Sequence, residues 1–346
     1  KFTALNHKNV KGEKDIIEGI RSIFDQDGSN QILSITNMKR TELSLVHAPL
    51  AEFMEKFRTG YFGRRNKFQK MTMPLVVKEI LEPGSTANPL AKEFAKAINE
   101  AMEIGRTRTN QFGGRVAKIK GNYLPQPHNS TKIGRVPQEE WTKDISSYLD
   151  LEQMINNKTN RSFTQEELLL ELPNTYNAIR TEGVNRLTPG ARMGSSSLGN
   201  QRLDHRFLVF KDAESYLAYQ SKYGDADVIS TIYQHLESIS RDTAMMRALG
   251  PNPNSGFRFL KDIVRIETKD LDLKPQDAIR SKLEGLENLY MTHSGRLNSA
   301  ADKNIANGFA GLRHMLTSSV IGSAALLALS DFGFTRMTSK FLALPA

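Results

Sequence analysis

The residues best suited to chemistry gather in one stretch of the sequence, residues 202–253. Their side chains are imidazoles, carboxylates and guanidinium groups, at Asp204, His205, Arg206, Asp212, His235, Arg241 and Asp242. A histidine beside a carboxylate can act as a general acid or base, so one hypothesis is a hydrolase or nuclease that uses His205 and His235. The alternative is a polar network that fixes a strand to a helix, because buried polar side chains require partners. No nucleophile motif such as G-x-S-x-G lies nearby, which favours the structural network.

Residue types and spacing disfavour metal and nucleotide sites. The chain has no cysteine, and no two of its 7 histidines have the spacing that places two metal ligands on one face of a helix. Neither of the common glycine-rich phosphate-binding motifs occurs. The nearest approach, at residues 190–195, lacks the lysine and a preceding apolar strand. We therefore expect no metal and no cofactor.

A second group of residues has the composition of a nucleic-acid-binding surface. Rings and cations interleave between residues 57 and 70, and the candidate phosphate contacts are Arg58, Arg64, Arg65, Lys67 and Lys70. Such interleaving is typical of proteins that bind single strands or the phosphate backbone. A smaller basic group follows at Arg106, Arg108, Arg115, Lys118 and Lys120. The helical spacing of Phe57, Tyr61 and Phe68 favours another interpretation of the first group, in which the rings lie in the core and the cations are solvated.

Residues 314–330 contain no Lys, Arg, Asp or Glu. As a helix, these roughly 17 residues would be about 25 Å long, at the short limit for crossing a bilayer. Serine and threonine dilute the hydrophobicity, so a buried or oligomer-interface helix is favoured over a membrane span. The candidate membrane or interface residues are Leu316, Val320, Ile321, Leu326 and Leu327.

Caps and periodicity predict the elements that position the first group. Residues 207–210 form a short extended run, and Asp212 is placed to cap a helix over residues 213–223. A longer helix follows and ends at Gly250-Pro251. Its apolar residues recur at helical spacing, at Ile229, Ile232, Tyr233, Leu236, Ile239, Thr243 and Met246.

Helix signals continue in the rest of the chain. Periodicity predicts helices over residues 13–24, 50–57 and 89–112, and Thr164-x-x-Glu167 is a capping box before a leucine-rich helix. Residues 31–47 fit neither a helical nor a strand period.

Composition sets the fold class and the division of the chain. With 346 residues, 39% hydrophobic and 8% aromatic, the sequence predicts a mainly α protein with a helical bundle-like architecture and a few short strands. The net charge of +9 favours contact with nucleic acid or anionic lipid without selecting either. A Gly/Ser/Pro loop at residues 181–200 separates a helical, basic region, 1–180, from region 201–346, which ends in an apolar helix. Because the chain starts without Met, we expect it to be part of a longer polypeptide.

Region 201–346 also carries a series of short motifs. They are Asp204-His205-Arg206-Phe207, Phe210-Lys211-Asp212-Ala213, Tyr216-Leu217-Ala218-Tyr219, Gly224-Asp225, His235, Arg241-Asp242 and Leu249-Gly250-Pro251-Asn252-Pro253. Two flanking pieces extend the series: YLPQPH at residues 123–128 with Trp141 and Leu149-Asp150, and an apolar segment at residues 312–345. In these motifs the chain resembles a family of very large phage proteins that are carried inside the virion or assembled into its ejection machinery.

The resemblance implies a structural segment of a large phage virion protein that assembles with itself or with other virion proteins for genome delivery. It implies a location in the capsid interior or the ejection apparatus, and in the host cell envelope after ejection. A homo-oligomer is expected, with DNA and the host membrane as further partners. The alternative from another class is a nucleic-acid-binding module of a virion-packaged polymerase-type protein.

Overall fold

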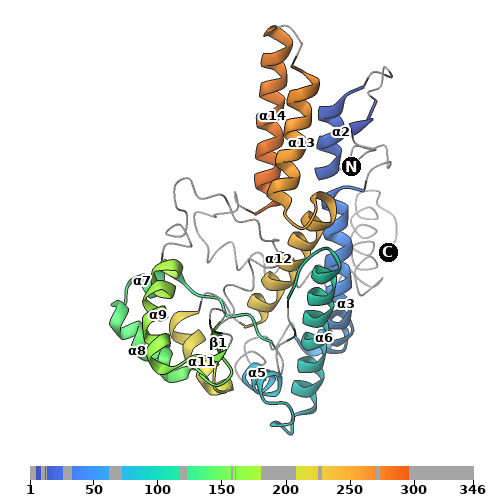
Figure 1. The fold of residues 1–346 in the computed structure, drawn as a ribbon. Helices are drawn as coiled ribbons and strands as arrows, with labels where there is room; N and C mark the ends of the chain where they lie inside the picture. The colour runs from blue at the N-terminus through green and yellow to red at the C-terminus, as the bar shows by residue number, and fades with distance from the viewer. Residues whose placement is uncertain are drawn as a thin grey trace, which may run out of the picture.

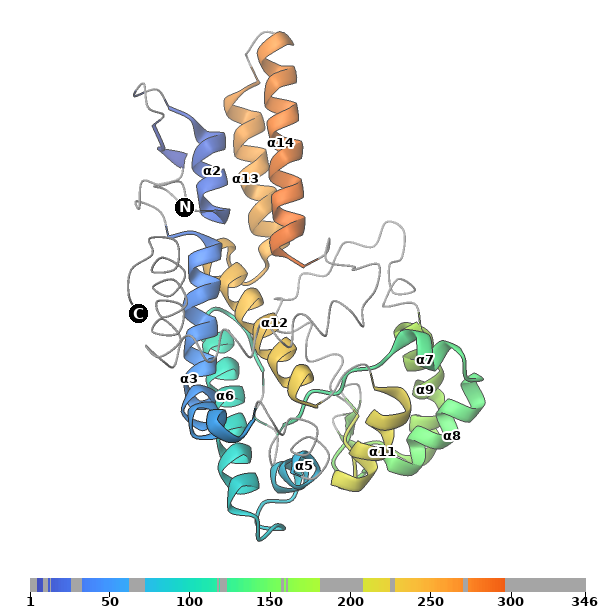
Figure 2. The same ribbon diagram turned by 180° about the vertical axis from the view of Figure 1, so that it is seen from behind.

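A computed structural model describes residues 5–8, 12, 14–25, 33–61, 72–116, 118, 123–156, 159, 161–180, 208–224, 228–269 and 273–295. Within this part of the chain almost all regular structure is helical, and the strands form one two-stranded sheet. The prediction of a mainly α protein with a few short strands is confirmed. The helices form three groups in space, which we call the central bundle, the lobe and the arm (Figure 1 and Figure 2).

The central bundle consists of three long helices that all pack on one another, and a shorter one that covers one of them. The long helices are α3 (Ile35–Tyr61), α6 (Pro89–Gln111) and α12 (Val228–Leu249), and the shorter helix on α6 is α5 (Met73–Leu81). Every residue of the stripe predicted for α12 is buried. The periodicity of this segment therefore identified the face that α12 turns toward its neighbours.

The lobe lies to one side of the central bundle (Figure 1). It contains α7 (Ser130–Gly134), α8 (Gln138–Tyr148), α9 (Gln165–Arg180), α11 (Ala213–Tyr223) and the antiparallel strands β1 (Ile155–Asn156) and β2 (Arg161–Ser162). Trp141 of α8 is fully buried, and its ring centroid lies 5.7 Å from that of Tyr176 on α9. The apolar core of the lobe continues into the central bundle, so the two share one core.

The arm projects from the other end of the central bundle (Figure 2). Its helices are α2 (Ile16–Phe24), α13 (Pro253–Glu267) and α14 (Leu273–His293). The rings of Phe257 and Tyr290 stack with centroids 4.4 Å apart, and the edge of Phe24 meets both. These rings belong to a second apolar core, which also includes Leu249 at the end of α12.

A tight corner joins α12 to α13. Gly250 has a φ of +102°, a conformation that favours glycine, and the side chain of Asn252 accepts a hydrogen bond from the backbone N–H of Ser255 to cap α13. A Cβ atom at Gly113, the loop after α6, would lie 2.6 Å from Cγ of Pro251. The motif at residues 249–253 therefore forms the corner that carries the arm.

The helix-start signals of the sequence are confirmed. Asp212 caps α11, since its carboxylate accepts the backbone N–H of Ser215 at 2.7 Å. Thr164 and Glu167 form the reciprocal capping box, with N–H···O distances of 3.1 and 3.2 Å. Such signals are local and hold regardless of where the helix packs.

The helix α3 departs from the prediction. The sequence predicted a helix only over residues 50–57 and no clear period over residues 31–47, whereas one helix runs from Ile35 to Tyr61 with Pro49 inside it. Proline removes a backbone donor and disfavours a helix interior. The buried face of α3 also mixes polar and apolar residues, because Glu42 and His47 are as buried as Val46 and Leu50. Packing on α6 and α12 stabilises a helix that periodicity did not indicate.

Segments from both sides of residues 181–200 pack together in space. Helix α11 packs on α5, α7 and α8, and α12 packs on α3 and α6. In the arm, α13 and α14 pack on α2. Residues 181–200 themselves lie outside the described residues.

Candidate functional site

Two motif segments of the resemblance pair through their backbones in the lobe. Phe210 forms a β-bridge with Leu149, and the backbone N–H of Asp150 donates to the carbonyl oxygen of Val209 at 2.8 Å. The extended conformation predicted before α11 is therefore present in its described part, residues 208–210, and it is fixed by the segment that follows α8.

Tyrosines of α11 hold the other flanking motif, YLPQPH. The hydroxyl of Tyr216 donates to the carbonyl oxygen of Pro125 at 2.8 Å, and the hydroxyl of Tyr219 lies 2.8 Å from Nδ1 of His128. Both tyrosines are buried, and burial raises the pKa of each phenol above its ordinary value. The phenols therefore stay protonated and serve as hydrogen-bonding groups of the core.

A polar clamp on the rim of the lobe joins α8 to α11. The carboxylate of Asp144 forms an ion pair with Lys222 and accepts a 2.7 Å hydrogen bond from the hydroxyl of Tyr223. The hydrogen bonds from Lys222 and Tyr223 lower the pKa of Asp144, and the same contact with Asp144 raises the pKa of Lys222. Burial, followed by the bond to Asp144, raises the pKa of Tyr223 to about 12. These directions all stabilise the charged pair and the neutral phenol at neutral pH.

The described residues of the predicted polar network do not lie together: one is in the lobe and three are in the central bundle. Asp204, His205 and Arg206 lie outside the described residues. Asp212 lies in the lobe at the start of α11, where the N–H of Ser215 lowers the pKa of its carboxylate. His235, Arg241 and Asp242 lie on α12 in the central bundle.

The residues on α12 have partners that suit an architectural role. The ring of His235 lies 5.4 Å from that of Tyr123, the first residue of the YLPQPH motif. Arg241 pairs with the nearly buried carboxylate of Asp242 at 2.9 Å. His235 thus contacts a motif segment, whereas Asp212 caps a different helix, α11.

Of the two basic groups predicted from the sequence, the structure describes side chains only in the second. The side chains of Arg58, Arg64, Arg65, Lys67 and Lys70 lie outside the described residues. In the second group, Arg106 binds Glu103 at 2.7 Å and Lys118 lies 3.9 Å from the same carboxylate. Arg108 binds Glu42 with two hydrogen bonds. These three cations neutralise carboxylates of the protein itself.

The sequence did not predict one charged cluster, which joins three helices of the central bundle. Glu42 of α3 is only 1% exposed, and Arg108 of α6 binds it through Nε and Nη2 at 2.7 and 2.6 Å, while Nη1 of Arg247 on α12 approaches to 3.3 Å. Both guanidinium groups also lie about 5 Å from the ring centroid of Phe112, at 5.2 and 5.5 Å. The hydrogen bond to Glu42 raises the pKa of Arg108. No local signal links these residues, because they meet only where three helices cross.

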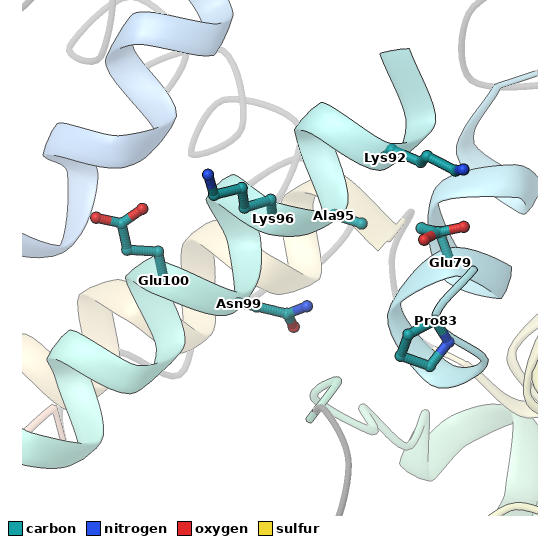
Figure 3. Close-up of a pocket in the computed structure, with 7 residues that line it drawn as sticks. All are labelled: Glu79, Pro83, Lys92, Ala95, Lys96, Asn99 and Glu100. Atoms are coloured by element: carbon teal, nitrogen blue, oxygen red, sulfur yellow. The ribbon is translucent and has the colours of Figure 1, made fainter. Parts of the chain in front are cut away.

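A hollow of about 360 Å³ lies between α5 and α6. Its lining residues are Glu79, Pro83, Lys92, Ala95, Lys96, Asn99 and Glu100 (Figure 3). In this view the side chains diverge: Lys92 extends toward α5, whereas Lys96 and Glu100 extend to the opposite side of α6. The carboxylate of Glu79 already accepts the backbone N–H groups of Gly84 and Thr86. The hollow therefore presents no convergent set of groups.

The described residues contain no candidate membrane span and no candidate metal site. Leu316, Val320, Ile321, Leu326 and Leu327 lie outside them, and among the helices that are described none is long and apolar enough to span a membrane. Within the described residues, no group of three His, Asp or Glu side chains is placed to hold a metal ion.

Comparison of the chain with protein-family models, curated proteins and solved structures finds no match.

Proposed function

We propose that this chain is a structural segment of a large phage virion protein, internal or ejected, which assembles with itself or with other virion proteins for genome delivery. The proposal begins from the motif resemblance. Its main support is that two motif segments far apart in sequence pair with each other in the lobe: the side chain of Gln126 donates to the carbonyl oxygen of Leu208, 82 residues away. The motifs thus mark contacts within one folded unit.

The use of the polar groups also supports an architectural role. The phenols of the YLAY motif hold Pro125 and His128, Asp212 caps a helix, and Asp242 pairs with Arg241. A group that supplies a cap, a pair or a buried hydrogen bond contributes to stability and fixes the packing of its segment. A scaffold that must hold its shape during assembly requires contacts of this kind.

In this proposal the chain lies in the capsid interior or the ejection apparatus and reaches the host cell envelope after ejection. Its partners are other virion proteins and further copies of itself, with DNA and the host membrane as additional contacts.

Mass spectrometry of purified virions of the encoding phage tests the proposal. We expect peptides from the described helices in intact particles, within a longer parent chain, and their depletion from particles that have ejected their DNA. Lysine-reactive cross-linking before digestion should join these peptides to other virion proteins or to a second copy of the chain. Absence of the peptides from intact, washed particles would overturn the proposal.

A substitution at His235 separates the structural role from an enzymatic one. His235→Ala removes the ring that packs on Tyr123, so we expect a lower melting temperature for the purified chain. His7→Ala is the matched control, because His7 lies near the start of the chain, outside the three helix groups. A hydrolytic activity that His235→Ala abolishes without a change in melting temperature would contradict the structural role.

A further inference from the structure

His293, the last residue of α14, lies where the arm meets the central bundle. Its ring centroid is 5.7 Å from that of Phe24 at the end of α2, and its Nε2 is 3.9 Å from Oδ1 of Asp25. The side chain of His293 is only 16% exposed. An imidazole in this position is mostly enclosed, with one carboxylate within reach.

The surrounding contacts tie the same point to other helices. The hydroxyl of Thr36, in the first turn of α3, donates to the backbone carbonyl of Phe24 or to the carboxylate of Asp25, at 3.1 and 2.9 Å. Beyond His293, the chain turns at Gly295, whose φ is +76°. A Cβ atom at Gly295 would lie 2.3 Å from Nη1 of Arg241 on α12, so the backbone of the turn lies directly against that guanidinium group.

The charges that face His293 come from three elements. Asp25 of α2 favours the protonated imidazole, and Lys39 of α3 opposes it. Lys39 pairs with Glu237 of α12 at 2.8 Å, and Arg241, against the following turn, pairs with Asp242. The favourable carboxylate is half exposed, whereas the ring itself is enclosed beside Phe24. Burial therefore has the largest effect and, with Lys39, outweighs Asp25, so the pKa of His293 is lower than its ordinary value.

We propose that His293 is an acid-sensitive latch: as a neutral ring it holds the end of α14 against the end of α2, and its protonation weakens this contact and loosens the turn at residues 294–295. The latch is a property of the arm and does not depend on the proposed virion role. It gives the protein a local response to mild acid at the end of α14.

The direction of the response follows from linkage. The pKa of His293 is lowered in the closed state, so the open state binds the proton more readily. The closed end of α14 is therefore most stable above the ordinary histidine value of 6.5, and this stability is lost as the pH falls through 6.5 toward the lower value of the closed state. Because residues 165–180 of the lobe, which form α9, contain no histidine, that helix serves as an internal reference.

Hydrogen exchange measured by mass spectrometry on the whole chain tests the latch, with each rate normalised to the intrinsic rate at that pH. Between pH 7.5 and pH 5 we expect protection in the last turn of α14 to fall severalfold, to at most about thirtyfold, the limit set by linkage to an ordinary histidine. Protection in α9 should stay constant. In His293→Phe, which keeps a ring on Phe24 but cannot be protonated, protection at the end of α14 should not depend on pH.

Two further variants sharpen the test. Asp25→Asn removes the carboxylate that stabilises the protonated ring in the closed state, so the pKa of His293 in that state should fall further and the loss of protection in acid should become larger. His235→Phe changes a histidine that lies elsewhere, beside Tyr123, and should leave the response of α14 intact. Equal loss of protection in the wild type and in His293→Phe would overturn the latch. If His293→Phe does not fold, NMR titration of the wild-type ring decides, since a midpoint at or above 6.5 also contradicts it.

Discussion

The lobe and the arm are both assembled from segments far apart in sequence, but different interactions hold them together. In the lobe, hydrogen bonds of tyrosine hydroxyls and backbone groups join the segments in addition to the apolar core, as at Tyr216 and Pro125. In the arm, three rings from α2, α13 and α14 pack on one another. A hydrogen bond requires one particular donor and acceptor at a defined distance and angle, so it fixes how two segments are aligned. Ring packing buries apolar surface but restrains the alignment less.

The two regions also differ in their cores. The lobe shares its apolar core with the central bundle, whereas the arm has a second core that reaches only the end of α12 and the start of α3. We therefore expect the lobe to unfold together with the central bundle and the arm to unfold more independently. The chain contains a single tryptophan, Trp141, which lies in the lobe and gives that region its own fluorescence signal.

The largest expected effect is that of Phe24→Ala in the arm. Removing a fully buried ring that contacts Phe257 and Tyr290 should cost about 3–5 kcal/mol of arm stability. Urea unfolding followed by circular dichroism should show an early loss of part of the helix signal, while the Trp141 fluorescence midpoint stays near that of the wild type. Coincident shifts of both signals would show that arm and lobe form one cooperative unit.

Glu42→Gln in the central bundle should have the next largest effect. The variant leaves Arg108 and Arg247 without their carboxylate, which should cost about 2–3 kcal/mol, because breaking a buried ion pair strands the partner charges and these arginines keep partial access to water. Since α12 connects to both regions, fluorescence and circular dichroism should shift together. Glu103→Gln, which removes a partly exposed carboxylate from Arg106, is the matched control and should cost less than about 1 kcal/mol. Equal effects of the two variants would argue against a special role for the buried cluster.

Removing one hydroxyl from each region compares them directly. Tyr216→Phe leaves the buried carbonyl of Pro125 without its donor and should cost about 1–2 kcal/mol. Tyr290→Phe removes a bond to Asn254 that is only partly buried, and should cost about 0.5–1 kcal/mol because water can replace it. Chemical denaturation of both variants measures the difference. A larger loss of stability for Tyr290→Phe would contradict the view that hydroxyl hydrogen bonds matter more in the lobe than in the arm.

The smallest expected effect is a change in the alkaline stability of the lobe. Tyr223 has a pKa of about 12 when folded and an ordinary value of 10.0, so the unfolded chain loses this proton first and stability falls as the pH rises from 10 toward 12. The raised pKa of Lys222 acts in the same direction. Urea unfolding of the wild type and Tyr223→Phe at pH 9 and pH 11, followed by Trp141 fluorescence, should show a shallower decrease for the variant. Identical decreases in stability for the two proteins would show that Tyr223 does not cause the alkaline loss of stability.

Local signals identified several elements of this fold from the sequence. The range 213–223 coincides with α11, because a side-chain cap at Asp212 and a stop at Gly224 depend only on neighbouring residues. The apolar stripe of α12 was also identified, because a helix that packs on two neighbours must bury residues at helical spacing. In contrast, only residues 50–57 of α3 were predicted as helix, and the part up to Pro49 was not, since the packing that stabilises it involves residues far along the chain.

The sequence by itself therefore determined the helical class, the starts of several helices and the motif residues to compare with the structure. Only the tertiary structure decided which distant residues meet: His235 lies beside Tyr123, and Arg108 neutralises the buried Glu42. The physical reason is the separation along the chain over which each interaction acts. Capping and periodicity act within a few residues of the chain, whereas the partner of a buried charge or hydroxyl is set by which helices cross.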